Sequence, residues 1–176
     1  MLRATAMRLY ASKIPTIVEA IVRTNVDGGD IEVSDKTEFK QDCESILREY
    51  LRVDRDLTER AKDQMEARGL PYSDLFKVRR SLAEEIDFGI GDEGANWIAN
   101  QLVEMFSASG FVEEIFVEDS LLRRKLRDLL KRHMQADSDL DREVRKHLRH
   151  LDEGTSSFEI EYQKQLELVR RKHGLG

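Results

Sequence analysis

Three side chains in the last third of the chain have types and a spacing that suit metal binding. Glu143, His147 and His150 would share one face of a continuous helix, and a carboxylate with two imidazoles is a ligand set that transition metals accept. The metalloprotease and di-iron helical motifs are absent, however, and neighbouring cations would repel a metal ion. We therefore interpret this stretch as a solvated basic face, with a metal-binding protein or enzyme using these residues as the alternative.

A second pattern with chemical meaning is GxGxxG, formed by Gly89, Gly91 and Gly94. In dinucleotide-binding proteins such a loop follows a strand and delivers pyrophosphate to a helix N-terminus. Here the preceding residues are helical and charged, and Asp92 and Glu93 would repel phosphate. We predict that these glycines have a structural role, as a hinge between the two halves of the chain. The sequence contains no P-loop, nucleophile elbow or readable catalytic triad, so we expect no catalytic residues, no cofactor and no enzymatic activity.

The elements that position these side chains occur twice in the sequence. The window from Ile46 to Met65 matches the window from Leu129 to Leu148 when it is displaced by 83 residues, and every apolar position of the second window falls on an apolar position of the first. The pairs Asp54 with Asp56 and Asp137 with Asp139 recur in the same places. Recurrence ahead of a shared leucine indicates structural ion pairs rather than catalytic carboxylates.

Each half is predicted to contain a short helix, a glycine turn, a short strand, a long helix and a medium helix. The first long helix should run from about Lys36 to Arg68 and end at Gly69, and the second should continue through Leu151 to Gly154. We expect Ser156 and Glu159 to form a capping box for the last helix.

The predicted fold is all-α, with residues 7–87 and 88–176 forming two helical repeat units of one globular domain. Neither unit could bury its apolar surface alone, so we expect them to pack about a pseudo-twofold axis with antiparallel long helices. The strands around Ile31 and Ile115 would add a minor two-stranded ribbon. Met7 is a plausible natural start, and we expect residues 1–6 to be a disordered extension.

Composition agrees with a helical protein that stays in the cytoplasm. Charged residues make up 36% of the chain and there are only two prolines, as expected of exposed helices. The single cysteine, Cys43, cannot form an internal disulfide and is predicted to be buried. No window approaches 18 uninterrupted apolar residues and the N-terminus lacks a signal-peptide core, so we expect no membrane partner.

Charge is distributed unevenly, and this is the main functional indication in the sequence. Residues 121–150 carry a net charge of +5, whereas residues 1–120 carry −10. A basic helix of this kind suits a phosphate backbone or an acidic protein surface, although it could instead neutralise the acidic half of its own chain. The basic side chains that we expect to contact a partner are Arg123, Arg124, Arg127, Lys131, Arg142, Arg145, Lys146 and Arg149.

Several strings along the chain, among them MRLYASK (7–13), EYLRVDRDLTERA (49–61), FGIGDE (88–93) and DREVRKHLRHLDEGTSSFEIEYQ (141–163), resemble a bacterial family named domain of unknown function 507. The resemblance implies a helical fold, a bacterial cytosolic setting and Met7 as the start, but no activity. The charged and polar residues of these strings are first targets for mutation: Arg8, Tyr10, Lys13, Glu49, Arg52, Asp141, Glu143 and Arg145.

From these observations we expect a non-enzymatic helical interaction or regulatory protein. Its basic long helix would contact a macromolecular partner, with RNA or a ribonucleoprotein as the first candidate and an acidic protein as the second. A purely structural homodimer is a further alternative.

Overall fold

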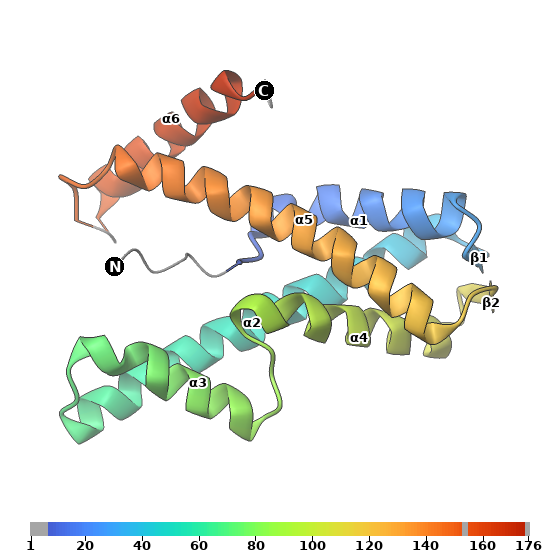
Figure 1. The fold of residues 1–176 in the computed structure, drawn as a ribbon, viewed down its shortest axis with the longest axis horizontal. Helices are drawn as coiled ribbons and strands as arrows, with labels where there is room; N and C mark the ends of the chain where they lie inside the picture. The colour runs from blue at the N-terminus through green and yellow to red at the C-terminus, as the bar shows by residue number, and fades with distance from the viewer. Residues whose placement is uncertain (1–6, 153–154, 175–176) are drawn as a thin grey trace.

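The computed structural model describes residues 7–152 and 155–174, apart from the side chains of residues 136–138. The predicted extension, residues 1–6, lies outside this part. As predicted, the described chain is helical with a small two-stranded sheet (Figure 1). The elements in chain order are α1 (Ile14–Ile21), a π-helical turn (Val22–Asp27), β1 (Ile31–Val33), α2 (Lys36–Arg68), α3 (Leu75–Glu85), α4 (Gly94–Ala108), β2 (Val112–Ile115), α5 (Asp119–Lys146) and α6 (Ser156–Lys172).

Helix α2 has the predicted boundaries because both of its ends are encoded locally. The Asp35 side chain caps the N-terminus by accepting a hydrogen bond from the Glu38 backbone N–H at 3.1 Å. Gly69 ends the helix with φ of +62°, a left-handed conformation that glycine adopts without penalty. Between these ends, an apolar stripe is buried along the helix: Phe39, Cys43, Leu47, Tyr50, Leu57, Ala61 and Met65.

Helix α5 is shorter than predicted, and the start of α6 is capped differently. The helix ends at Lys146, and turn hydrogen bonds from His147 N–H to Val144 C=O and from Leu148 N–H to Arg145 C=O follow it. The predicted stop, Gly154, lies outside the described residues. The side chain that caps α6 belongs to Thr155, which accepts from the Phe158 N–H at 3.2 Å, so the predicted capping box at Ser156 is wrong.

The two predicted strands pair as an antiparallel ribbon between the halves of the chain. Ile31 lies opposite Ile115, and Glu32 lies opposite Glu114. A displacement of 83 residues maps Ile31 onto Glu114 and Glu32 onto Ile115, so these two pairs exchange under a two-fold rotation. This register is the one that the predicted pseudo-twofold axis requires, and the axis itself stays a prediction.

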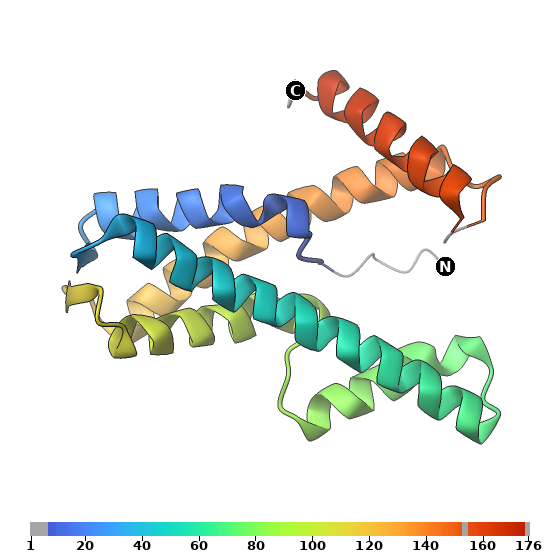
Figure 2. The same cartoon turned by 180° about the vertical axis from the view of Figure 1, so that it is seen from behind.

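The direction of the long helices differs from the prediction. Helices α2 and α5 both begin beside the ribbon and run toward the opposite end of the molecule, crossing in projection (Figures 1 and 2). They are therefore not antiparallel. A two-fold axis that ran through the ribbon along the molecule's length would produce this arrangement, because such a rotation preserves the component of a helix along the axis and reverses only the component across it.

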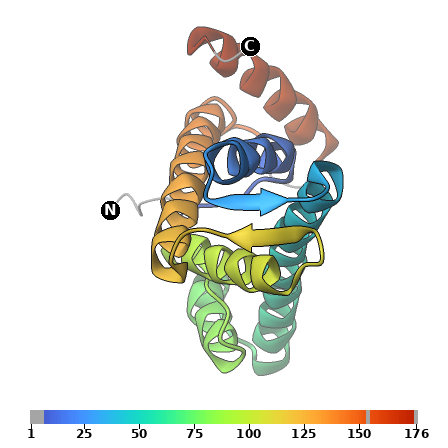
Figure 3. The ribbon, with the colours of Figure 1, turned by 90° about the vertical axis from the view of Figure 1, so that its right-hand side faces the viewer.

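The short helices fill the space between the long ones. Helices α1 and α4 each pack against both α2 and α5, and they lie on opposite sides of the ribbon (Figure 3). Helix α3 packs on the far end of α2 and α6 on the far end of α5 (Figure 1). The main buried cluster contains residues from both predicted units, from Leu9 to Met134. A second, smaller cluster joins α5 to α6 through Leu140, Val144, Leu148, Phe158 and Val169.

Candidate functional site

The N-terminal half of α5 presents a row of cations on one side of the helix. We call Arg123, Arg124, Arg127 and Lys131 the basic row. At about 100° per residue, these four positions fall within one half of the helix circumference. The opposite side is buried in the main cluster through Leu122, Leu126 and Leu129. The packing of α5 therefore directs the basic row away from the main cluster, with Arg123 and Arg124 exposed and Arg127 and Lys131 half-buried.

Few of these charges are neutralised by the acidic half of the chain. Among the described residues, Arg127 pairs with its neighbour Asp128 at 3.4 Å, and no carboxylate lies within 4.0 Å of Arg123, Arg124 or Lys131. Lys125 of the same helix does reach the acidic half, since its Nζ donates to the buried Asp30 at 2.9 Å. Internal neutralisation, considered as an alternative in the sequence, thus accounts for Lys125 but not for the basic row.

The predicted cations further along the chain have other surroundings. Arg145 bonds to Asp141 and lies over the rings of Phe158 and Tyr162, so it stabilises the joint between α5 and α6. Arg142 is 3.9 Å from Asp139. Lys146 and Arg149 are exposed, and Arg149 lies beyond the end of α5. The eight predicted cations therefore divide into the basic row and a second group beside α6.

The candidate metal ligands are not brought together. Helix α5 ends at Lys146, which removes His150 from the helical face shared by Glu143 and His147. The Glu143 carboxylate instead lies 2.7 Å from His173 Nε2 and 3.5 Å from Lys172 Nζ, and its bond to His173 lowers the pKa of Glu143. Within residues 7–152 and 155–174, no group of three or more His, Cys, Asp or Glu side chains could hold a metal ion.

The repeated acids have structural surroundings in the described part of the molecule. Asp54 pairs with Arg79 of α3, and Asp56 pairs with Arg52 at 2.8 Å. Asp139 accepts from the Gln135 side chain at 2.9 Å. The Asp137 side chain lies outside the described residues. These contacts agree with the interpretation of the acids as members of ion pairs.

The glycine motif is explained by packing. Gly91 has φ of +58°, and a Cβ added at Gly94 would overlap the Tyr50 hydroxyl. That hydroxyl donates to the Gly89 carbonyl at 3.0 Å, and the Tyr50 ring stacks on Phe88 with centroids 4.9 Å apart. The loop therefore closes over a buried tyrosine, which gives its glycines a structural role, and a hinge between the two units stays a prediction.

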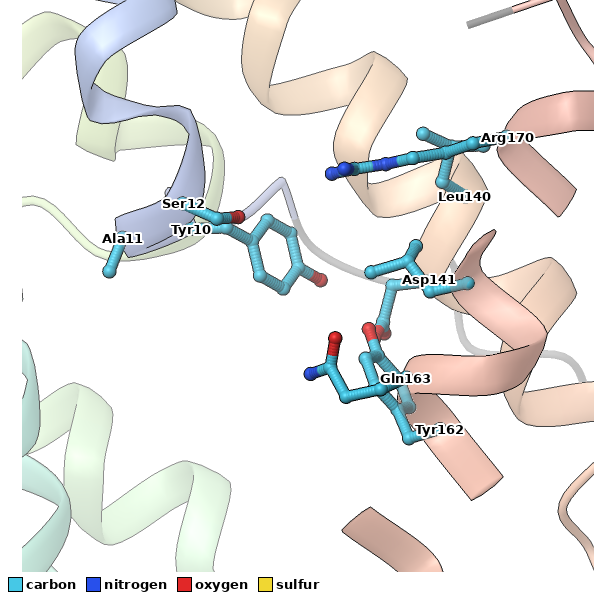
Figure 4. A pocket seen from close by; sticks show the side chains of 9 residues that line it. Tyr10, Ala11, Ser12, Leu140, Asp141, Tyr162, Gln163 and Arg170 are labelled. Carbon is cyan, nitrogen blue, oxygen red and sulfur yellow. The ribbon is translucent and has the colours of Figure 1, made fainter. Parts of the chain in front are cut away.

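A pocket lies where the N-terminal segment meets α5 and α6 (Figure 4). Asp141 is its central buried group: only 3% exposed, it accepts from the Tyr162 hydroxyl at 2.6 Å and from Arg145 Nε at 2.9 Å. The volume is about 260 Å³, and the lining residues are Tyr10, Ala11, Ser12, Leu140, Asp141, Tyr162, Gln163, Leu166 and Arg170.

Tyr10 occupies an unusual position in this pocket. Its hydroxyl points toward Asp141 and Tyr162 (Figure 4), is buried, and makes no hydrogen bond to any described residue. Burial, and then the negative charge of Asp141, raise the pKa of Tyr10 to about 12, while Arg8 acts in the opposite direction. The phenol is therefore protonated at neutral pH, and its hydroxyl faces the Asp141 carboxylate.

The pocket was not predicted from the sequence. Tyr10 and Asp141 were identified only as members of the strings that resemble a known family, and Arg145 was identified there and as a cation expected to contact a partner. Tyr162, Gln163 and Arg170 were not identified as site residues. Their common location depends on how α6 folds back onto α5, for which no local pattern gives a signal. The closest sequence indication was the proximity of Asp141 and Arg145 at helical spacing.

Comparison with known proteins gives a family but no activity. The model of a family described as protein of unknown function (DUF507) matches residues 7–175. No curated protein matches the chain. None of the described helices is long and apolar enough to cross a membrane.

Proposed function

The chain belongs to the DUF507 family of proteins of unknown function, and we propose that it is a non-enzymatic interaction protein that binds RNA through the basic row of α5. Arginine and lysine side chains contact phosphate groups, and this electrostatic contribution supplies most of the affinity of sequence-independent nucleic-acid binding. The proposal concerns binding of a phosphate backbone and requires no catalytic group.

Two observations support this proposal: Arg123 and Arg124 are exposed while Arg127 and Lys131 are half-buried, and the row has few acidic partners among the described residues. Arg123, Arg127 and Lys131 are four residues apart, so they repeat about every 6 Å along the helix and span about 12 Å. The neighbouring acid is Asp128, which reaches Arg127. A rigid helix therefore holds several guanidinium and ammonium groups in a line, which costs little additional ordering when a polyanion binds.

A positive field also extends from the basic row toward α1. The half-buried imidazole of His133 has a lowered pKa, first because it is buried and then because of the charges of Lys13, Arg132 and Arg23. Lys13 and Arg23 flank α1, which packs against α5. Cations from two separate elements thus raise the potential around the middle of α5, which favours association with an anionic polymer.

The test is RNA binding by a variant with the basic row neutralised. Arg123→Gln, Arg124→Gln and Arg127→Gln would be combined, and fluorescence anisotropy would measure binding to a labelled RNA duplex and to a labelled single strand. If each lost cation removes one phosphate contact, affinity at moderate salt should fall roughly 10- to 100-fold.

A matched control removes the same number of positive charges from the other long helix, α2. Arg55→Gln, Arg60→Gln and Lys62→Gln alter three exposed cations of α2, and this variant should bind RNA within about twofold of the natural protein because those cations lie outside the basic row. Equal losses in both variants would show that net charge, rather than the row, determines binding. Failure of the natural protein to bind either RNA at low salt would refute the proposal and leave an acidic protein as the candidate partner.

A further inference from the structure

The pocket beside α6 contains groups that its own contacts do not use. The Tyr10 hydroxyl is buried and makes no hydrogen bond to a residue of the described part of the chain, and the Gln163 amide and Ser12 hydroxyl line the same hollow. The Arg170 guanidinium extends from α6 toward the N-terminal segment (Figure 4), and no carboxylate of the described residues pairs with it. The hollow therefore offers several hydrogen-bonding groups and one cation without an anionic partner.

The Asp141 carboxylate repels an anionic ligand less strongly than its negative charge alone suggests. Asp141 is engaged by the Arg145 guanidinium at 2.9 Å and by the Tyr162 hydroxyl at 2.6 Å, and it is 3% exposed. The positive charge of Arg145 therefore compensates the negative charge of Asp141. The charge of Arg170 then leaves the pocket with a net positive charge. An anionic group of a ligand could therefore bind beside Arg170.

The remaining walls suit a flat aromatic body. The rings of Tyr10 and Tyr162 line the hollow together with the aliphatic side chains of Leu140 and Leu166. Aromatic side chains are the usual surface on which unstacked bases pack, because every base has a π-face. A volume of about 260 Å³ is just below the range of about 300 to 1,000 Å³ for small-molecule sites, which suits one nucleotide and excludes a longer segment.

The location relates the pocket to the basic row. Both lie on α5: Asp141 follows Lys131 by ten residues, which corresponds to about 15 Å along the helix. Arg142 adjoins Asp141 in sequence and is the next arginine of α5 after Arg132, while the sequence between these two arginines carries Asp137, Asp139 and Asp141. A single strand bound to the basic row would therefore cross this acidic stretch before one of its nucleotides reached the pocket and Arg142.

We infer that this pocket receives one unstacked nucleotide of a single-stranded RNA. Its base would pack against Tyr10 and Tyr162, with its edge accepting from the Tyr10 hydroxyl and the Gln163 amide, and its phosphate would bind Arg170. This inference rests on the proposed function and adds a preference for single strands, because a base inside a duplex cannot leave its stack without a free-energy cost. Duplex RNA would contact the basic row alone.

The first test uses free mononucleotides with the full-length chain. Saturation-transfer difference NMR with adenosine or uridine 5′-monophosphate should show signals from base protons, and inorganic phosphate should compete weakly. Arg170→Gln should reduce the signal at least about fivefold, and Tyr10→Ala should weaken binding about 5- to 150-fold through lost stacking. Arg171→Gln is the matched control: it removes the same charge from the next residue, which is exposed and paired with Glu167, and should leave the signal unchanged.

Two results would overturn the inference. One is the absence of a base signal at millimolar mononucleotide, and the other is an equal signal in the natural protein, the Arg170→Gln variant and the Arg171→Gln variant. Thermal denaturation of each variant verifies folding, and Tyr10→Phe, which removes only the hydroxyl, should weaken binding less than Tyr10→Ala.

The second test separates this inference from the proposed function. Arg170→Gln should reduce affinity for single-stranded RNA while leaving duplex affinity within about twofold, whereas the triple variant of the basic row should weaken binding to both. If the triple variant behaves as expected but Arg170→Gln affects neither RNA, the pocket inference is wrong and the proposed function stands. If the natural protein binds neither RNA, both fail.

Discussion

Replacing Tyr162 by phenylalanine removes the hydroxyl that donates to Asp141 across the joint between α5 and α6. The two oxygen atoms are 2.6 Å apart, and Asp141 is 3% exposed, so water cannot readily replace the lost donor. Hydrogen bonds to charged groups contribute about 1.5 to 3 kcal/mol. Because Tyr162 itself is partly exposed, we expect a loss near the lower end of this range, about 1.5 to 2 kcal/mol in the free energy of unfolding.

Urea unfolding at neutral pH, followed by circular dichroism, measures this loss. Tyr72→Phe is the matched control, because the Tyr72 side chain is 75% exposed and its hydroxyl makes no hydrogen bond within the described part of the chain. This substitution should change the free energy of unfolding by less than about 0.5 kcal/mol. Amide hydrogen exchange in α6 adds a local measurement, since α6 packs on the smaller of the two buried clusters and should open more readily in Tyr162→Phe.

A double-mutant cycle identifies the interaction that is lost. Asp141→Asn combined with Tyr162→Phe should cost less than the sum of the two single changes, by at least about 0.5 kcal/mol, because both remove the same bond. Additive effects, or a Tyr162→Phe loss no larger than that of Tyr72→Phe, would refute the role of Asp141 as the polar centre of this joint.

Three further predictions concern packing and pH. Gly94→Ala should cost about 1 to 3 kcal/mol because its Cβ would overlap the Tyr50 hydroxyl, and adding Tyr50→Phe should recover part of that loss in urea unfolding. Leu140→Ala should cost about 2 to 5 kcal/mol by leaving a cavity in the smaller cluster, whereas Leu168→Ala, at a position 55% exposed, should cost less than about 1 kcal/mol. The pKa of Tyr10 is raised from 10.0 to about 12, so its neutral form stabilises the folded state fully below pH 10.0, and this contribution should disappear as the pH rises to about 12. Partial exposure reduces the effect to about 1 to 2 kcal/mol, and Tyr10→Phe should show a correspondingly smaller fall in thermal stability over that pH range.

The parts of the fold that the sequence predicted are those with local physical causes. The limits of α2 follow from a continuous apolar stripe and from Gly69, whose φ of +62° disfavours other residues. The pairing of β1 with β2 followed from two short apolar segments at equivalent places in the halves. Both predictions needed only periodicity and turn chemistry.

The end of α5 was predicted wrongly because its apolar pattern continues after the helix stops. Leu148 and Leu151 keep the spacing of a helix, but the chain turns after Lys146 and uses them in the cluster with α6. Periodicity correctly indicated that Leu148 and Leu151 face a hydrophobic cluster. It did not indicate that they pack against α6 after α5 has ended. The same error produced the candidate metal site, since His150 was placed on a helix that ends before it.

The candidate site divides in the same way. The basic row was predicted because helical spacing alone places its members on one side of α5. The pocket was not, because Tyr10, Asp141 and Arg170 come from three separate segments whose contact depends on tertiary packing. Whether α5 faced solvent or the acidic half also required the structure, which pairs Lys125 with Asp30 and leaves Arg123 and Arg124 exposed.

The most direct measurement of the central claim is the salt dependence of RNA affinity for the natural protein and for the Arg123→Gln, Arg124→Gln, Arg127→Gln variant. Anisotropy titrations from about 50 to about 200 mM salt give the slope of log affinity against log salt concentration, which falls by roughly 0.7 to 0.9 for each phosphate contact removed. We predict a slope that is shallower in the variant by about 2. Equal slopes for the two proteins would contradict phosphate binding by the basic row.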